Sequence, residues 1–352
     1  MSDVASAVRR MVHAMPKAEL HLHLDGCLRP QTALDLADQF GIDAPRTWDG
    51  MFDALVAAAH PGSQAELLKS FVLPLQLMQS PEALTRITTD LVEDKAADNV
   101  RYMELKWAPA VHLEAGLSLD DVISTVADAA LRAAERLGVV VRLTVVAMRS
   151  ADPAFNVSVA HAAVRHRSAG VTGFDLAGFE VSHPDPTIHA EAFEVARSGG
   201  LGLTVHSGEL MDDGALVRRA LGLRPDRIAH GASAANDPTL MSELIERGVT
   251  LDLCPTSNVQ AGTVATFADH PLVSLLRAGV PVTINTDDTT ISDITLSEEW
   301  LSCIRELGLT LPELWACNLH ALDVAFVDEP TRAALREQFE AWAQRIPELH
   351  QS

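Results

Sequence analysis

Cysteine is scarce in this chain, and the cysteines present are dispersed. The 352 residues include four, Cys27, Cys254, Cys303 and Cys317, and no two of them have C-x-x-C spacing. This pattern argues against a cysteine zinc site and is typical of the reduced cysteines of a cytoplasmic protein.

Positive charge is also in short supply. Lys and Arg number 27 against 48 Asp and Glu, which gives a formal net charge of −21, and no basic run is longer than a pair such as Arg218-Arg219. A chain of this charge repels the phosphate backbone of nucleic acids. We therefore expect no nucleic-acid partner.

Long apolar runs are missing as well. No stretch approaches the roughly 18 apolar residues of a membrane helix, and the first twenty residues lack the uninterrupted apolar core of a signal peptide. No Ser/Gly-rich linker marks a domain boundary. These absences predict a soluble cytoplasmic protein with no membrane partner and a single domain over residues 1–352; they leave the oligomeric state open.

Strand-like and helix-like segments alternate along the chain, which is the pattern of a parallel α/β fold. Eight apolar or β-branched runs are predicted as strands: 18–24, 100–107, 139–148, 172–178, 202–206, 227–230, 249–254 and 281–286. Between them lie helical segments such as 119–137, which starts with acidic residues and is followed by Gly138. Eight strands separated by helices predict a (β/α)8, or TIM, barrel.

Additional helices are expected at two places. A long insertion after the first strand, at about 45–90, contains an apolar stretch broken by Pro74 and is predicted to form a lid. Its apolar side chains either cover a reaction site or pack on the barrel: Leu67, Leu68, Phe71, Leu73, Leu75 and Leu77. Three helices within about 295–347 are expected to complete the outer ring.

Two histidines near the amino terminus are the first candidate functional residues along the chain. His21 and His23, in ELHLHLDG, are two positions apart on the first predicted strand, so both imidazoles lie on one face. Three later segments place metal-ligand or acid–base residues at the carboxyl ends of strands: TVHSGE with His206 and Glu209, RIAHG with His230, and NTDD with Asp287 and Asp288. In an α/β barrel this end forms the active site.

These residue types fit a catalytic zinc site, which takes imidazole and carboxylate ligands and keeps one position for water. We expect one Zn²⁺ per chain, held by His21, His23, His206 and Asp287. Zinc lowers the pKa of its bound water from 15.7 toward about 7, so this hydroxide can attack without a protein nucleophile.

Seven segments, in order along nearly the whole chain, resemble the adenosine deaminase family of the amidohydrolase superfamily: PKAELHLHLDG, RYMELKWAP, GFDLAGFE, TVHSGEL, RIAHG, LCPTSN and NTDD. The resemblance implies a (β/α)8 barrel that carries one zinc ion, or occasionally another divalent metal. It also implies a small-molecule purine nucleoside as substrate. Adenosine or 2′-deoxyadenosine would lose its C6 amine to give inosine or deoxyinosine and ammonia, a step of purine salvage.

The resemblance also assigns roles to single residues. The metal-ligand positions of the family match His21, His23, His206 and Asp287. Glu209 resembles the acid that protonates purine N1, His230 the group that orients the hydroxide, and Asp288 the partner of purine N7. Gly178, in DLAG, matches a backbone N–H that meets N3, and Asp25 matches a contact to the ribose 5′-hydroxyl. His23 is expected beside the substrate too.

The chemistry supports these roles independently. Attack on the aromatic C6 requires a ring nitrogen to accept a proton, so Glu209 must act as an acid, and a dry pocket raises a carboxyl pKa to suit this. The adjacent Asp287 and Asp288 point in different directions, so one can bind metal while the other addresses the base. The fourth strand has no lysine to bridge two metals, and Lys106 is expected in an ion pair beneath the site.

The chain departs from the family pattern beside Gly178. Phe179 stands where an acidic residue is common, and it either alters what the pocket accepts or fills space between strand and helix. Other 6-aminopurines, namely 6-amino-6-deoxyfutalosine and adenine, therefore stay open as substrates. Asp25 favours a nucleoside over a free base, and the lack of a glycine-rich phosphate loop disfavours a phosphorylated substrate.

Two other functional classes account less well for these residues. A non-catalytic barrel protein is disfavoured because all four expected ligands, Glu209 and His230 are present. A hydrolase that acts on cyclic amides or esters with the same metal is disfavoured, because its reaction would give no role to Glu209, Asp288 and the DLAG segment together.

Overall fold

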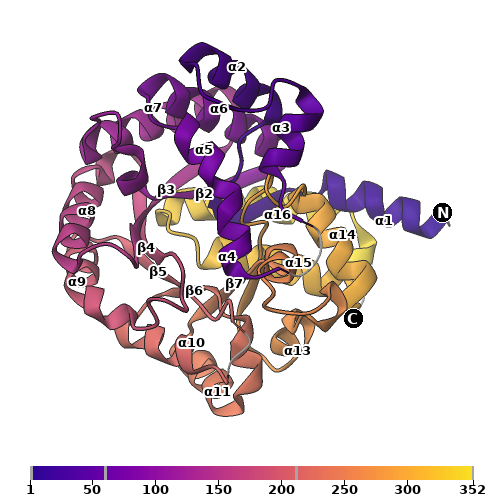
Figure 1. Cartoon of the computed structure of the whole chain (residues 1–352). Helices are drawn as coiled ribbons and strands as arrows, with labels where there is room; N and C mark the ends of the chain where they lie inside the picture. Colours follow the sequence, from indigo (N-terminus) through magenta and orange to yellow (C-terminus); the bar gives the residue numbers. More distant parts are fainter. Residues whose placement is uncertain (1–2, 59–61, 211–212, 351–352) are drawn as a thin grey trace.

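The computed structural model describes residues 3–58, 62–210 and 213–350. Eight parallel strands follow one another around a single sheet in the order β1 to β8, and helices surround them (Figure 1). The strands are β1 Lys17–His23, β2 Val100–Trp107, β3 Val140–Met148, β4 Val171–Ala177, β5 Gly202–Ser207, β6 Arg227–His230, β7 Thr250–Leu253 and β8 Val282–Ile284. The predicted TIM barrel is confirmed.

The barrel closes where β1 meets the segment after β8. The backbone N–H of His23 donates to the carbonyl of Asp287 at 2.8 Å, and the N–H of Asp287 donates to the carbonyl of His21 at 3.1 Å. These bonds form a parallel bridge between Leu22 and Asp287. The closure therefore fixes the backbone of three of the four expected metal ligands.

The outer helices begin and end where their sequences indicate. In α7 (Leu119–Leu137), Ser118 and Asp121 form a reciprocal capping box, and Gly138 ends the helix with a left-handed φ of 65°. The other helices of this ring are α6 Pro81–Ala97, α8 Pro153–Arg165, α9 Ala190–Ser198, α10 Ala215–Ala220, α11 Pro238–Arg247 and α13 Leu272–Arg277. Among the described residues, no helix has both the length and the apolar character needed to span a bilayer.

The insertion after β1 lies at one end of the barrel. Its elements are α2 Pro30–Phe40, α3 Trp48–Leu55, α4 Gln64–Leu67, the 3-10 turn η1 Leu68–Phe71, and α5 Val72–Leu77. Figure 1 shows α4 crossing in front of the strands. Pro74 falls within α5, and the apolar stretch forms three short segments instead of one helix.

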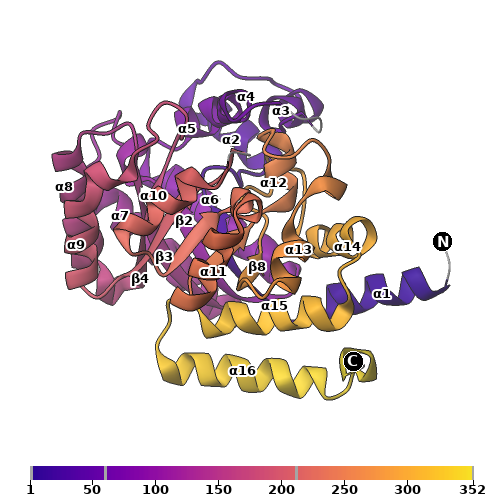
Figure 2. The same ribbon diagram turned by 90° about the horizontal axis from the view of Figure 1, so that it is seen from below.

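The C-terminal helices lie partly at the opposite end (Figure 2). They are α14 Leu296–Leu307, α15 Leu311–Asp323 and α16 Glu329–Ala343. From α15, the side chain of Asn318 accepts the N–H of Ala18 at 2.9 Å and donates to the carbonyl of Pro16 at 2.8 Å. The helix thus covers the amino-terminal end of β1, so these helices do more than complete the outer ring.

Candidate active site

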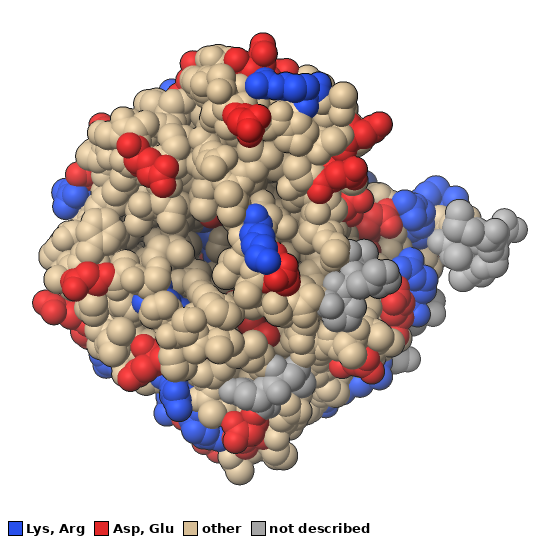
Figure 3. Space-filling view, in the orientation of Figure 1, with Lys and Arg blue, Asp and Glu red and all other residues tan. Residues whose placement is uncertain are grey.

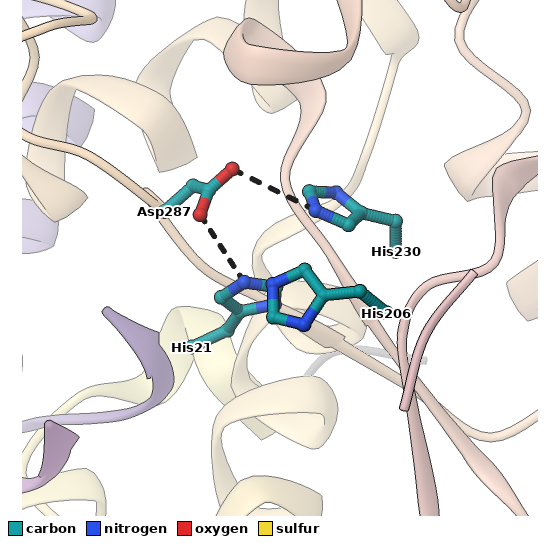
Figure 4. Close-up of side chains that lie close together, drawn as sticks. All are labelled: His21, His206, His230 and Asp287. Carbon is teal, nitrogen blue, oxygen red and sulfur yellow. Dashed lines mark ion pairs between the residues drawn. The ribbon is translucent and has the colours of Figure 1, made fainter. Parts of the chain in front are cut away.

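Three histidines and an aspartate converge at the carboxyl ends of the strands. One ligand atom from each of His21, His206, His230 and Asp287 lies within 4.8 Å of all the others, and all four residues are buried (Figure 4). They come from β1, β5, β6 and the segment after β8. The barrel brings together residues up to 266 positions apart in the chain, as His21 and Asp287 show.

His23 points into the same cluster. Its Nε2 lies 3.2 Å from Nε2 of His21, 3.0 Å from Nε2 of His206 and 3.5 Å from Oδ1 of Asp287. The His21 and His23 side chains share one face of β1, as the alternation predicts. All four expected ligands therefore meet, and His230 lies beside them.

This donor set fits a divalent metal ion. Burial lowers the pKa of His21 and of His206, so both rings are neutral and present lone pairs. Tetrahedral ligands about 2.0–2.1 Å from a zinc ion lie roughly 3.3 Å apart, close to the separations around His23. Burial lowers the pKa of His23, but contacts with Asp25 and Asp287 outweigh this effect and raise the pKa to about 9. The carboxylates around the His23 ring therefore favour a cation at this position.

Further polar groups hold the candidate ligands in place. Oδ2 of Asp175 lies 3.1 Å from Nδ1 of His206 and 2.6 Å from Nζ of Lys106, which is the ion pair expected beneath the site. The hydroxyl of Ser257 donates to Oδ2 of Asp287 at 2.7 Å. Such partners orient ligands and are missed when only ligand types are searched. In the sequence, the signal that could have indicated Asp175 and Ser257 was their position within the segments GFDLAGFE and LCPTSN.

A chain of hydrogen bonds sets the tautomer of His230. The backbone N–H of Leu272 donates to Nδ1 of His270 at 3.2 Å, so the neutral His270 ring carries its proton at Nε2, 3.0 Å from Oδ1 of Asn258. The Asn258 amide N–H₂ then faces Nδ1 of His230 at 3.2 Å. Burial lowers the pKa of His230 to about 4. The neutral ring therefore presents an Nε2–H donor to the cavity.

Two non-glycine residues of the site adopt left-handed backbone conformations. His230 has φ 66° and Asp287 has φ 65°. Each such conformation costs about 1–3 kcal/mol, so it persists only where the surroundings enforce it. The barrel closure described above provides this restraint at Asp287. Backbone strain at two neighbouring polar residues is typical of a functional site.

Glu209 lies beside this cluster and is suited to hold a proton. It is buried, and burial raises its pKa above the ordinary value for glutamate. Its Oε1 lies 3.6 Å from Nε2 of His230, and its Oε2 accepts a hydrogen bond of 2.8 Å from the side chain of Gln64. The carboxyl group thus faces both the candidate metal site and the insertion.

Asp288 and Asp25 each bury a carboxyl oxygen that has no hydrogen-bond partner among the described residues. Burial and the neighbouring Asp287 raise the pKa of Asp288, which favours the protonated form of its carboxyl group. A Cβ at Gly26 would lie 1.7 Å from Oδ1 of Asp288, which explains the glycine of HLDG. Unpartnered buried carboxyl oxygens in a cavity indicate a polar ligand.

The cavity above the cluster is largely apolar. Leu67, Leu68, Phe71 and Leu75 of the insertion line it, with Gly178 and apolar side chains from the strand ends, and no Lys or Arg is among its described lining residues. Leu73 and Leu77 instead pack toward the main core. Phe179 is half-buried and outside this lining. Figure 3 shows the hollow in this face, with a rim that is mostly uncharged.

Comparison with known proteins identifies the family. The family model described as adenosine deaminase matches residues 16–342. The chain belongs to the adenosine deaminase family. The adenosine deaminase of Mycolicibacterium vanbaalenii is 38% identical over 345 residues, covering 93% of this chain and 94% of the relative.

Solved structures of related deaminases share the fold. The adenine deaminase of Arthrobacter aurescens has a TM-score of 0.86 at 26% identity, covering 94% of this chain and 99% of its own. An amidohydrolase of Burkholderia ambifaria with bound zinc has a TM-score of 0.87 at 27% identity, covering 98% and 95%. The N6-methyl-AMP deaminase of Arabidopsis thaliana has a TM-score of 0.84 at 26% identity, covering 96% and 99%. The adenine deaminase and the N6-methyl-AMP deaminase are thus named for different 6-aminopurines.

Proposed function

We propose that this adenosine deaminase family member is a zinc-dependent enzyme that hydrolyses the C6 amine of adenosine and 2′-deoxyadenosine to give inosine or deoxyinosine and ammonia. The observation that carries the proposal is the placement of Glu209, a buried carboxyl group of raised pKa, beside the cluster of His21, His206, His230 and Asp287. A proton donor next to a metal-binding group is the pairing that this reaction requires.

In this proposal His21, His23, His206 and Asp287 hold one zinc ion per chain. A bound zinc ion makes water a strong nucleophile at neutral pH by lowering its pKa toward about 7. His230 lies at the edge of this group, and its Nε2–H is directed to orient the oxygen that attacks C6. The zinc bound by the Burkholderia amidohydrolase supports the choice of metal.

Glu209 and Asp288 are proposed to supply the proton and the hydrogen bond that the purine ring needs during the reaction. As the water oxygen bonds to C6, Glu209 donates a proton to purine N1, which breaks the aromaticity of the ring. Asp288, whose raised pKa favours the protonated form, donates a hydrogen bond to N7, which is an acceptor. The proton still on the attacking oxygen then passes to the amine, the C6–N bond breaks, ammonia leaves, and the oxygen stays on the ring as the C6 carbonyl. The other proton of the water restores the carboxyl group of Glu209. One water is consumed for each ammonia released.

The lining of the cavity favours an uncharged nucleoside. The absence of Lys and Arg from its described lining residues disfavours a 5′-phosphate, and the carboxylate of 6-amino-6-deoxyfutalosine would also lack a cationic partner. Oδ1 of Asp25 is buried, lies 3.8 Å from Nδ1 of His23 and has no hydrogen-bond partner among the described residues, so it can accept a hydrogen bond from the ribose 5′-hydroxyl. The backbone N–H of Gly178, which lines the cavity, is proposed to meet N3. Salvage of purine nucleosides in the cytoplasm is the matching physiological role.

A substrate panel tests this proposal. The zinc-loaded protein is incubated separately with adenosine, 2′-deoxyadenosine, adenine, 6-amino-6-deoxyfutalosine and N6-methyl-AMP, and amine loss is followed by ultraviolet absorbance. We expect the highest kcat/KM for the two nucleosides. A higher kcat/KM for adenine or for N6-methyl-AMP would overturn the substrate assignment, and no reaction with any 6-aminopurine would overturn the proposed activity itself.

A further inference from the structure

Gln64 is a buried amide at the start of α4, the part of the insertion that crosses the barrel. Only 4% of the residue is exposed. Its side-chain N–H₂ donates to Oε2 of Glu209 at 2.8 Å, and its side-chain carbonyl accepts the backbone N–H of Glu180 at 3.2 Å. One amide thus connects the insertion, the carboxyl group of Glu209 and the segment after β4.

This amide has a defined orientation. The Glu180 N–H fixes the carbonyl side of Gln64, so the N–H₂ side must face Glu209. Glu180 is itself held, because its carboxylate accepts the N–H of Gly208 at 3.0 Å and lies 3.5 Å from Arg149. The backbone N–H that holds the Gln64 carbonyl thus belongs to a residue whose own side chain is held by Gly208 and Arg149.

Glu209 depends on this contact for its direction. Among the described residues, Gln64 provides the side-chain hydrogen bond to the Glu209 carboxyl group, whereas His230 lies beyond hydrogen-bond distance at 3.6 Å. With Oε2 bound to Gln64, Oε1 is directed to the side of His230. Without Gln64, the carboxyl group could rotate about its terminal torsion, which has broad energy wells.

The segment that carries Gln64 is attached to the barrel by few contacts. Leu67 packs in a small buried cluster with Ala261 and Ile291, separate from the main core. The backbone N–H of Ala57 donates to the carbonyl of Ile291 at 2.8 Å. An element held by a small satellite cluster opens at lower free energy than the core does. Gln64 therefore leaves Glu209 whenever this segment detaches.

We propose that Gln64 is a positioning residue that orients Glu209 for proton delivery when the α4 segment is docked on the barrel. Covering the substrate and aligning the acid then occur in one event. The inference rests on the proposed function, since it assigns Gln64 a part in the protonation of N1. It adds a residue that acts through Glu209 and contacts neither the metal ligands nor the attacking oxygen.

The test replaces Gln64 by leucine, which has a similar volume and keeps an apolar contact in the docked segment. Loss of a hydrogen bond to a carboxyl group predicts a fall in kcat for adenosine of about 10- to 100-fold, with metal content unchanged. Binding is measured for the adenosine analogue that has C–H in place of N1, which cannot take the proton. Its Kd should stay within about 2-fold of the wild-type value.

Gln260→Leu is the matched control. It removes a buried amide at the end of helix α12 (Pro255–Gln260), where the backbone carbonyl of Gln260 accepts the N–H of Gly62 at 3.3 Å. The side-chain carbonyl of Gln260 accepts from the hydroxyl of Ser292 at 2.8 Å, and among the described residues it makes no hydrogen bond to Glu209. Its kcat should exceed that of Gln64→Leu by at least about 5-fold. If Gln64→Leu does not retain metal or fold, Gln64→Met provides the same comparison with a more flexible side chain.

The outcomes separate the two proposals. Failure of the wild-type protein to deaminate any 6-aminopurine refutes the proposed function. If the wild-type protein is active, a kcat for the Gln64 variant within 2-fold of wild type refutes the positioning role. A loss of affinity for the N1-lacking analogue equal to the loss of kcat/KM for adenosine also refutes it, because the effect would then reside in packing of the insertion.

Discussion

At the scale of single residues, the site places similar carboxyl groups in different surroundings. Asp287 lies 3.1 Å from His21, and these contacts hold its pKa well below the ordinary value despite burial. Asp288, the next residue, has a pKa raised by burial and by Asp287. Neighbouring carboxyl groups whose pKa values are shifted in opposite directions suit different tasks, one as an anionic ligand and the other as a hydrogen-bond donor.

Glu209→Gln tests the acid directly. The amide has the same shape but has no acidic proton to transfer, so we expect kcat for adenosine to fall by about 10²- to 10⁴-fold, the usual contribution of a general acid. Metal content, measured by atomic absorption, should remain at one ion per chain because Glu209 is not among the proposed ligands. Glu66→Gln, at an exposed carboxyl group of α4, is the control. Unchanged turnover in Glu209→Gln would contradict the acid role.

Residues with conspicuous chemistry could be predicted from the sequence, whereas most of the residues that support them, Lys106 excepted, could not. His21, His23, His206, Glu209, His230, Asp287 and Asp288 were predicted from residue type and from their places at strand ends, and they do converge. Gln64 was missed because an amide in an apolar stretch carries no motif. His270 was missed because its contact with Asn258 depends on packing between two loops, which spacing along the chain does not encode.

At the scale of elements, the eight strands were predictable because each is a short apolar run. The insertion was less so, because the short segments around Pro74 depend on what they pack against. The apolar side chains of the insertion pack in two different clusters. Leu67 belongs to the small satellite cluster with Ala261 and Ile291, whereas Leu77 belongs to the main core.

Leu67→Ala and Leu77→Ala distinguish the roles of these clusters. Leu67→Ala should increase amide hydrogen exchange in α4 by about 10-fold or more and raise KM, while global stability in urea changes by less than about 1 kcal/mol. Leu77→Ala should lower global stability by about 2–5 kcal/mol, as is usual for a leucine in a core. Equal losses of global stability in both variants would mean that the insertion unfolds together with the barrel.

At the scale of the whole molecule, the barrel joins distant segments into one polar interior. Below the site, Arg227 is buried between Glu104 and Asp252, and its guanidinium also contacts the ring of Phe326 from the loop after α15. Charged groups buried this deeply are stable only when they are paired with an opposite charge. Removal of one partner typically lowers the free energy of unfolding by about 3–5 kcal/mol. The sequence predicted the barrel but not this interior, because the partners lie on three different strands.

Stability at acidic pH should depend on His270. Burial and His230 lower its pKa to about 3 in the folded protein, below the value of about 6.5 in the unfolded chain. Since the unfolded state takes up a proton first, this stability is present above pH 6.5 and declines as the pH falls. At pH 5 the loss is about 2 kcal/mol. Urea unfolding at pH 7.5 and pH 5 should show a drop smaller by this amount in His270→Gln. Equal drops would contradict the assignment.

The most direct measurement of the proposed activity follows adenosine in three preparations of the protein: metal-loaded, stripped with a chelator, and stripped protein reloaded with one equivalent of Zn²⁺. Ultraviolet absorbance should report conversion to inosine by the loaded protein, little conversion by the stripped protein, and recovery after reloading. Adenosine left unchanged by the metal-loaded protein, or converted equally well after complete removal of metal, would contradict the proposal of a zinc-dependent deaminase.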